Sequence, residues 1–391
     1  MIGPGEPVAE TGPAARRRRA LGAGLWFFAL GVVSVMVARD PARRSVTPVF
    51  HLAAERWWAR SDLYQDPRGY HYLPQFAILF APFHALPAPA GDLLWRALSV
   101  ACVLAGFDAF VRRARPARPG AFFLAASLLA LAPSLGAVRN GQTNLAFGGL
   151  CLLAAASLAG ERWRAAAAWL ALLVAVKPLG LVLVLLAPCF YVGLRRPLLV
   201  AVALLAAVPF LTAPPAYAAD QYRSAWTHLA GWSGTTENRF ADLTALLRAA
   251  GLALAPAAAL LLRATAAAGT LVLWLRAAPR TREPWRALTL VLLATTYLML
   301  FNPMTEKNSY AIVAPAFAVA AAALLGEPAT RRAGWFLAFI LVSEGILPEL
   351  LWRVTRDFGL WWDPLTALVV AGGLATAIVR RGDPFAEVAA A

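Results

Sequence analysis

The chain has 391 residues, 60% of them hydrophobic, and a mean hydropathy of +0.62. Long apolar runs recur along its whole length, which predicts an integral membrane protein and excludes a soluble globular domain. The net charge of +15 does not indicate nucleic-acid binding, because the arginines form short clusters between apolar runs, where they act as topology signals.

The N-terminal residues 1–19 are predicted to be a disordered cytoplasmic tail that ends in four arginines, Arg16 to Arg19. The apolar run 20–38 follows. Charge before an apolar run can also mark a signal peptide, but this run is long for that purpose and many apolar runs come after it. We interpret it as an uncleaved first span whose arginines hold the N-terminus in the cytoplasm.

A first external loop is predicted at residues 39–75. Within it, residues 50–59 place apolar and aromatic side chains on one side at helical spacing, which is typical of an interfacial helix. The next apolar run, 76–86, lies between Pro74 and Pro87 and is about half as long as a span. We expect that run to be re-entrant or interfacial.

The later runs alternate across the membrane, and the arginine-rich turns fall on the cytoplasmic side each time. Spans are predicted at 93–111, 121–138, 145–159, 198–212, a run ending near Leu275, 287–301, 310–325, 335–347 and 365–379. The fold class is therefore all-α, a polytopic transmembrane helical bundle of about ten spans. One transmembrane domain covers 20–381, with a second external loop at 213–253 and a cytoplasmic tail at 382–391, so that both termini are cytoplasmic.

The three cysteines, Cys102, Cys151 and Cys189, all lie in apolar segments without CxxC spacing. They are interpreted as buried thiols that act as small hydrophobic residues. The four histidines have no close pairing in the sequence, so no metal site is predicted.

The run 165–192 carries Lys177-Pro178 at its middle, with arginines before it at 162 and 164 and after it at 195 and 196. A single span would place one arginine pair outside, whereas two half-spans that meet at Lys177 keep both pairs inside. Proline disfavours a regular helix at this point, and irregular backbone at membrane depth is tolerated where it lines a cavity. We expect a broken hairpin with Lys177 in an outward-facing cavity beside Gln142 and Asn144.

This topology gathers uncommon polar features on the outer side: the acidic first loop, residues 139–144, Lys177, residues 237–242 and residues 302–308. The chain has only two lysines, Lys177 and Lys307, and both belong to this set. Amides and cations that converge at a membrane surface can bind a phosphate and sugar hydroxyls.

Each feature also has a structural interpretation. Residues 139–144 could form a tight turn at Gly141, Lys177 could snorkel at a kink, and residues 302–308 could be a solvated loop. Arg263, inside a span, could snorkel or pair with a buried carboxylate. Asp40 could be a solvated interfacial charge.

An ordered set of motifs resembles glycosyltransferase family 87 over roughly residues 46–320. The motifs are Ala53-Ala54-Glu55, Asp62-Leu63-Tyr64, Tyr72-Leu73-Pro74, residues 140–144, Lys177-Pro178 and Asn302-Pro303. The resemblance implies the GT-C fold and a polyprenyl-phosphate-sugar-dependent mannosyltransferase that inverts the sugar carbon in an outward-facing cavity. The implied partners are a polyprenyl-phosphate hexose, a glycolipid or glycan acceptor and membrane lipids.

The family's general base is a carboxylate early in the first external loop, and that position falls here near Ser45 or Val46. The resemblance therefore implies Asp40 as the catalytic candidate after a register shift, with Asp62 and Asp66 as the next choices. It further implies substrate-binding roles for residues in three groups. Gln142, Asn144 and Lys177 are expected on the lipid-phosphate side, with Arg139 and Arg263 as further partners there, and Asn302, Glu306 and Asn308 at the sugar or acceptor. Asn140 is a further substrate-binding candidate. No metal or cofactor is expected, because cationic side chains can stabilise the leaving phosphate.

The sequence thus predicts a hexosyltransferase in the plasma membrane with an active site that faces outside. Two other classes remain open. A lipid or glycan transporter or flippase could also use broken helices, although such proteins usually contain repeated halves and none is visible here. A catalytically inactive GT-C-like scaffold is the third possibility, because the expected carboxylate position lacks one.

Overall fold

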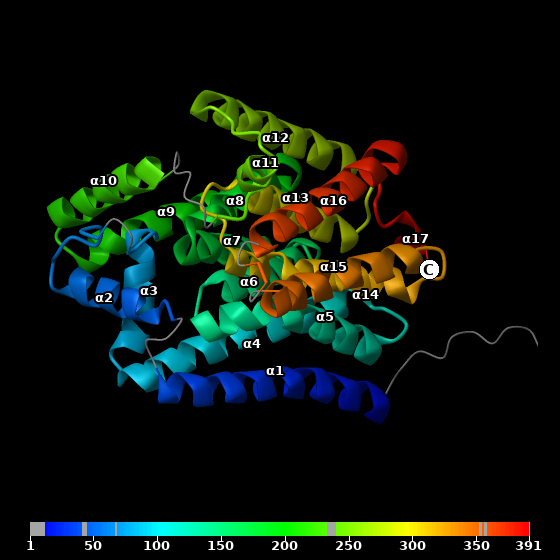
Figure 1. Ribbon diagram of the computed structural model, residues 1–391, viewed down its shortest axis with the longest axis horizontal. Coiled ribbons are helices and arrows are strands. Elements are labelled where there is room, and N and C mark those ends of the chain that lie inside the picture. The colour runs from blue at the N-terminus through cyan, green and yellow to red at the C-terminus, as the bar shows by residue number, and fades with distance from the viewer. Residues whose placement is uncertain are drawn as a thin grey trace, which may run out of the picture.

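The computed structural model describes residues 12–40, 45–66, 69–232, 240–351, 354–355 and 358–390. In these residues the regular secondary structure is entirely helical. The helices pack side by side into an elongated bundle (Figure 1), with α2, α3 and α10 gathered at one end. The start of α1 and the C-terminal helix α17 (Ala386–Ala390) both lie toward the other end.

Seven helical segments are long and apolar enough to cross a membrane, which confirms the polytopic bundle. They are α1 (Pro13–Arg39), α4 (Ala88–Ala114), α5 (Pro119–Asn140), Val192–Thr212, which comprises η2 (Val192–Leu194) and α9 (Arg195–Thr212), α12 (Pro256–Ala277), α15 (Arg331–Leu350) and α16 (Phe358–Arg381). The helix α1 begins within the stretch predicted as a disordered tail, so Arg16 to Arg19 form part of its first turns. Arg19 binds Asp108 of α4 at 2.8 Å there.

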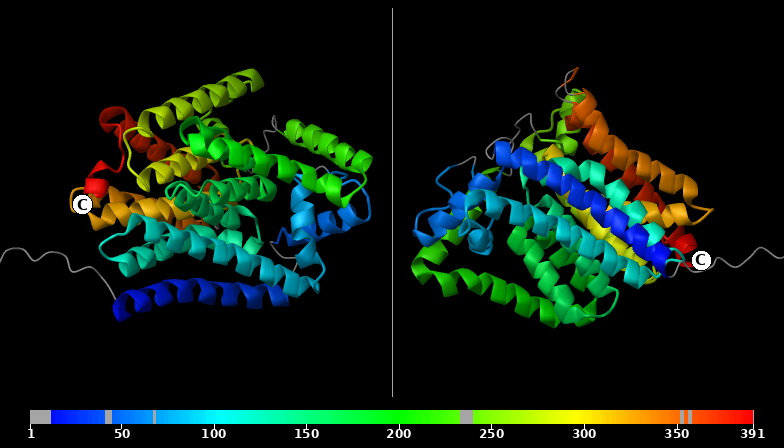
Figure 2. Two further views of the ribbon diagram at one scale, coloured as in Figure 1. Left: turned by 180° about the vertical axis from the view of Figure 1, so that it is seen from behind. Right: turned by 90° about the horizontal axis from the view of Figure 1, so that it is seen from below.

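Three of the predicted spans correspond to shorter helices: α6 (Asn144–Leu158), α13 (Trp285–Phe301) and α14 (Ala314–Gly326). These helices form the interior of the bundle. Every residue of α6 except Leu153 is buried, whereas α12 buries only Trp274 and Ala277. The long helices lie around this core, as Figure 2 shows for α1 along one side and α12 on the opposite side.

The chain between α1 and α4 covers one end of the bundle. It contains α2 (Thr47–Trp58) and α3 (Pro74–His84), and α10 (Pro215–Trp232) lies beside them. The prediction that α2 is an interfacial helix is wrong. Its apolar side packs inside the protein, where Phe50 and Trp57 are fully buried. The Phe50 ring makes an edge contact with Phe76 of α3 at 4.8 Å between centroids. As expected, α3 is too short to span the membrane.

The break at Lys177 has the predicted form. The helix α7 (Trp163–Val176) ends where Lys177 adopts an extended backbone, and η1 (Pro178–Gly180) and α8 (Leu181–Phe190) follow. Gly180 packs on the backbone of Leu173 and Val174. The rings of Trp163 and Tyr191, at the two outer ends of the pair, lie 6.0 Å apart between centroids. The chain therefore turns back at Lys177 and returns to the level at which α7 began.

Candidate functional site

Four polar side chains from three separate segments form a hydrogen-bonded set, here termed the Lys177 network: Gln142, Asn144, Lys177 and Glu306. The Lys177 Nζ donates to Asn144 Oδ1 at 2.8 Å, and Asn144 Nδ2 donates to Gln142 Oε1 at 2.6 Å. The Gln142 Nε2 then donates to Glu306 Oε2 at 3.1 Å. Two amides thus connect an ammonium group to a carboxylate.

Local backbone features place these groups. Gly141 ends α5 with φ of +70°, and α6 begins three residues later at Asn144. Only glycine adopts this conformation without strain. On the opposite side, Glu306 and Ser309 form a capping box at the start of η3 (Lys307–Ile312), which fixes the Glu306 backbone. Asn144 Nδ2 also donates to the Asn308 carbonyl at 3.0 Å and so connects α6 to η3.

The network retains unused hydrogen-bonding capacity. An ammonium group has three N–H donors, and among the described residues Lys177 Nζ contacts one acceptor, on Asn144. The neighbouring Thr143 hydroxyl is buried. Tyr72, from the loop before α3, lies near both Thr143 and Glu306, and burial raises the pKa of its phenol so that it stays neutral. Sequence reasoning used Tyr72 only as a motif residue and did not assign it to the site.

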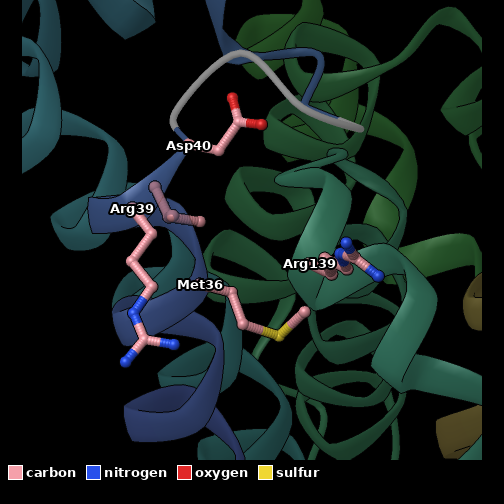
Figure 3. Close-up of a pocket in the computed structure, with 5 residues that line it drawn as sticks. Met36, Arg39, Asp40 and Arg139 are labelled. Atoms are coloured by element: carbon pink, nitrogen blue, oxygen red, sulfur yellow. The ribbon is translucent and has the colours of Figure 1, made fainter.

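Asp40 lies apart from this network. It caps α1, its side chain is exposed, and no hydrogen bond or ion pair joins it to the Lys177 network within the described residues. It lines a cavity of about 170 Å³ together with Met36, Arg39 and Arg139. In Figure 3 the Asp40 carboxylate and the Arg139 guanidinium come from opposite sides of this cavity and do not point toward each other.

Structural contacts hold the backbone of residues 139 and 140. Their carbonyls accept hydrogen bonds from Arg96 and from the Val46 amide, whereas the buried Oδ1 of Asn140 has no partner within the described residues. Arg263 faces Asp242, the N-cap of α11 (Leu243–Ala249), at 3.8 Å, which supports its alternative interpretation as the partner of a buried carboxylate. Residues 237–239 of the predicted polar set lie outside the described part of the chain.

The residues predicted for the sugar side divide between two environments. Asn302 forms a turn in which its Nδ2 donates to Thr305 Oγ1 at 3.2 Å. Glu306 belongs to the Lys177 network. The side chain of Asn308 lines a second cavity, of about 200 Å³, which Arg139 also lines.

The position expected for the family's carboxylate is part of a different cluster. This Arg96 cluster consists of Ser45, Thr47, His51, Asp92 and Arg96. Asp92 of α4 accepts from Thr47 Oγ1 at 2.8 Å and binds His51 Nε2 at 2.9 Å. The buried Arg96 donates to Ser45 Oγ and to the carbonyls of Val138 and Arg139. The cluster holds the end of α5, and therefore the Gln142 segment, against α2 and α4.

Sequence reasoning missed this cluster, because Asp92 and Arg96 stand at the start of a predicted span, where charges are ordinary. Their i,i+4 spacing was the available signal. The next carboxylate choices, Asp62 and Asp66, lie near the paired rings of His71 and His228. Among the described residues, no group of three or more His, Cys, Asp or Glu side chains is placed to bind a metal ion.

Residues 70–303, more than half of the chain, match the sequence profile of glycosyltransferase family 87. The matched region includes Tyr72, Gln142, Asn144 and Lys177, and it ends before Glu306 and Asn308. No curated protein matches the chain significantly.

Proposed function

The chain belongs to glycosyltransferase family 87 and is a membrane glycosyltransferase, and we propose that it transfers mannose from a polyprenyl-phosphate donor to a lipid-linked or glycan acceptor. The acceptor stands on the outer face of the plasma membrane, and both termini are cytoplasmic. The transfer inverts the sugar carbon.

The single observation that carries this proposal is the Lys177 network. A lysine at the break of an apolar hairpin has unused N–H donors and lies next to two amides. Ionisable side chains in apolar helices are expensive to bury and usually functional. An ammonium group held in this way can bind the donor phosphate and stabilise the charge that develops on it as it leaves.

The reaction follows from this placement. The bond between the sugar C1 and the phosphate oxygen breaks, and its electron pair leaves with polyprenyl phosphate. The acceptor hydroxyl oxygen forms the new bond to C1 from the opposite face. Its proton passes to a carboxylate, for which Asp40 is our candidate, because its cavity and the Asn308 cavity share Arg139 as a lining residue. Lys177 and Arg139 supply the positive charge, so the mechanism uses no metal or cofactor.

The arrangement of the helices supports an outward-facing site. The helix α1 runs from the end of the bundle that holds both described chain ends to the opposite end, where Asp40 and Arg139 line one cavity. Arg16 to Arg19 lie at the first end, and such clusters favour the cytoplasmic side. Gln142 and Asn144 follow closely after Arg139, and Lys177 and Glu306 bind to them, so the Lys177 network belongs to the second end.

The test uses the purified full chain in detergent with polyprenyl-phosphate mannose and a panel of glycolipid acceptors. Wild-type protein should release polyprenyl phosphate and form a glycosylated product. Lys177→Ala should lose this activity, whereas Arg381→Ala, which removes an exposed cation paired with Glu387, should retain it. Release that is undiminished in Lys177→Ala, or the absence of turnover with every hexose donor, contradicts the proposal.

The base is tested separately. Asp40→Asn should abolish transfer without weakening donor binding. If Asp40→Asn is fully active and Glu306→Gln is inactive, the proton acceptor is Glu306 instead, and the assignment of Asp40 is wrong.

A further inference from the structure

We propose that the second cavity binds a sugar ring of the acceptor, through the two buried carboxylates Glu344 and Asp363. This inference rests on the proposed function and names a binding site for its second substrate. The cavity lies between α5, η3, α15 and α16 and has a volume of about 200 Å³. We call it the acidic cavity, and its charged and amide lining residues are Arg139, Lys307, Asn308, Glu344, Glu349 and Asp363, of which Lys307 and Glu349 form an ion pair at 2.7 Å.

Both carboxylates are buried inside apolar helices. Glu344, within α15, has 5% of its surface exposed, and Asp363, within α16, has 1%. The helices α15 and α16 are two of the segments long enough to span the membrane. A carboxylate in such a segment is expensive, so its presence calls for a partner or a function.

Their hydrogen bonding within the described residues is incomplete. Glu344 Oε1 accepts from the Thr366 hydroxyl at 2.7 Å, but Glu344 Oε2 has no partner. Asp363 Oδ1 has no partner either. Buried polar atoms are nearly always hydrogen-bonded, so these two oxygens indicate a ligand that brings donors into the cavity.

The chemistry of the lining selects the ligand class. Carboxyl oxygens accept hydrogen bonds, and sugar hydroxyls can donate to them. An ionised phosphate has no hydrogen to donate to the two unpartnered carboxyl oxygens. A simple cation is not favoured either, because Arg139 and Lys307 line the same cavity. A neutral polyol satisfies both kinds of group, since each hydroxyl donates to a carboxylate and accepts from a cation or from Asn308.

The acidic cavity adjoins the Lys177 network through one residue. The Asn308 carbonyl accepts from Asn144 at 3.0 Å, while the Asn308 side chain lines the cavity. A substrate in the cavity would therefore stand next to a donor phosphate held by Lys177.

The assignment of the donor favours the acceptor as the occupant of the acidic cavity. The donor phosphate is assigned to Lys177, Gln142 and Asn144, and none of these residues lines the cavity. We therefore assign the cavity to the acceptor sugar, which would stand beside the donor.

The experiment measures binding of methyl α-D-mannopyranoside to the full chain in detergent by saturation-transfer NMR. Wild-type protein should bind this probe, and Glu344→Gln and Asp363→Asn should each bind it about tenfold more weakly, because each loses a carboxyl oxygen that accepts a hydrogen bond from the sugar. Glu387→Gln, which removes an exposed carboxylate, should bind as the wild type does. Thermal melting of each variant checks that it is folded.

A second variant tests the cavity without changing its charge. A methyl group at Gly136 would stand 2.6 Å from Asn308 Oδ1, so Gly136→Ala should narrow the cavity and weaken probe binding. Unchanged binding in the folded Glu344→Gln and Asp363→Asn variants, or no binding to wild-type protein at millimolar probe, overturns the inference.

Kinetics separate this inference from the proposed function. In the transferase assay, Glu344→Gln should raise the KM for the acceptor and leave the KM for the polyprenyl-phosphate donor unchanged. If transfer depends on Lys177 but the acceptor KM is unaffected by Glu344→Gln, only the acceptor site is wrong. If the probe binds through Glu344 and no hexose donor is turned over, the site stands and the proposed function fails.

Discussion

The Arg96 cluster and the Lys177 network are two polar groups at the same end of the bundle, and they differ in how completely their hydrogen bonds are made. Arg96 donates through Nε, Nη1 and Nη2, and Asp92 accepts through both oxygens. Lys177 contacts one acceptor among the described residues.

This difference separates positioning from binding. Buried charges that satisfy each other contribute to a unique arrangement of the helices but have no capacity left for a substrate. Groups with unused donors or acceptors can bind a ligand, at some expense in stability. The Arg96 cluster is therefore expected to affect stability when it is changed, and the Lys177 network is expected to affect activity.

The largest effect is expected for Arg96→Ala. This change leaves buried Asp92 without its cation and leaves the Val138 and Arg139 carbonyls without their donors, which should reduce the free energy of unfolding by about 3–5 kcal/mol. Denaturant or thermal unfolding in detergent measures it. A melting temperature equal to that of the wild type would show that the cluster does not hold α5 in place.

Lys177→Ala should show the opposite pattern. Loss of one charged donor to the leaving phosphate should reduce kcat by about 10²–10³-fold, as for donors that stabilise a transition-state anion. Its melting temperature should remain close to that of the wild type, because Lys177 makes one hydrogen bond to a side chain. If Lys177→Ala is less stable but fully active, the Lys177 network has a structural role and not a binding role.

Gly141→Ala joins the two groups, because Gly141 lies between the Arg96 cluster and Gln142. Its φ of +70° disfavours any other residue by about 1–2 kcal/mol, and the added methyl group would stand 2.7 Å from Thr47 Cγ2 and 3.0 Å from the Arg96 guanidinium. We expect moderate losses of both stability and activity. Gly269→Ala in α12, where nothing lies within 4 Å, is the matched control and should not be destabilising.

The smallest effect concerns pH. Burial lowers the pKa of His228, although the charges of Asp62 and Asp66 act in the other direction, and the ring stacks on His71. The unfolded chain therefore binds a proton more readily than the folded one, and stability should fall as the pH is lowered through and below the ordinary histidine pKa. Unfolding curves at several pH values should show this dependence, and His228→Gln should reduce it. If the stability of His228→Gln depends on pH as that of the wild type does, another titratable group causes the dependence.

Parts of the site could be predicted from local patterns. Proline after Lys177 terminates α7 whatever surrounds it, and the arginines at both ends of the run favour a hairpin. Glycine at 141 allows the turn before Asn144. These features brought Gln142, Asn144 and Lys177 into one network, as predicted.

The acidic cavity could not be predicted in this way. Glu344 stands inside a run that is otherwise apolar, and Asp363 stands just before another, but no local pattern shows that the two side chains line one cavity. Their significance arises when α15 packs against α5, where Gly345 lies against the backbone of Ala132. Asp40 shows the opposite error. The sequence predicted that it shares a pocket with Lys177, but it lines a separate cavity.

By itself, the amino-acid sequence determined the membrane class, the long apolar helices, the break at Lys177 and the family, because hydropathy, charge clusters and proline act over a few turns of chain. Only the tertiary structure decided which charges are satisfied and which are left with unused hydrogen-bonding atoms. That property depends on side chains that meet from helices separated by one or two hundred residues, and no local pattern encodes their packing.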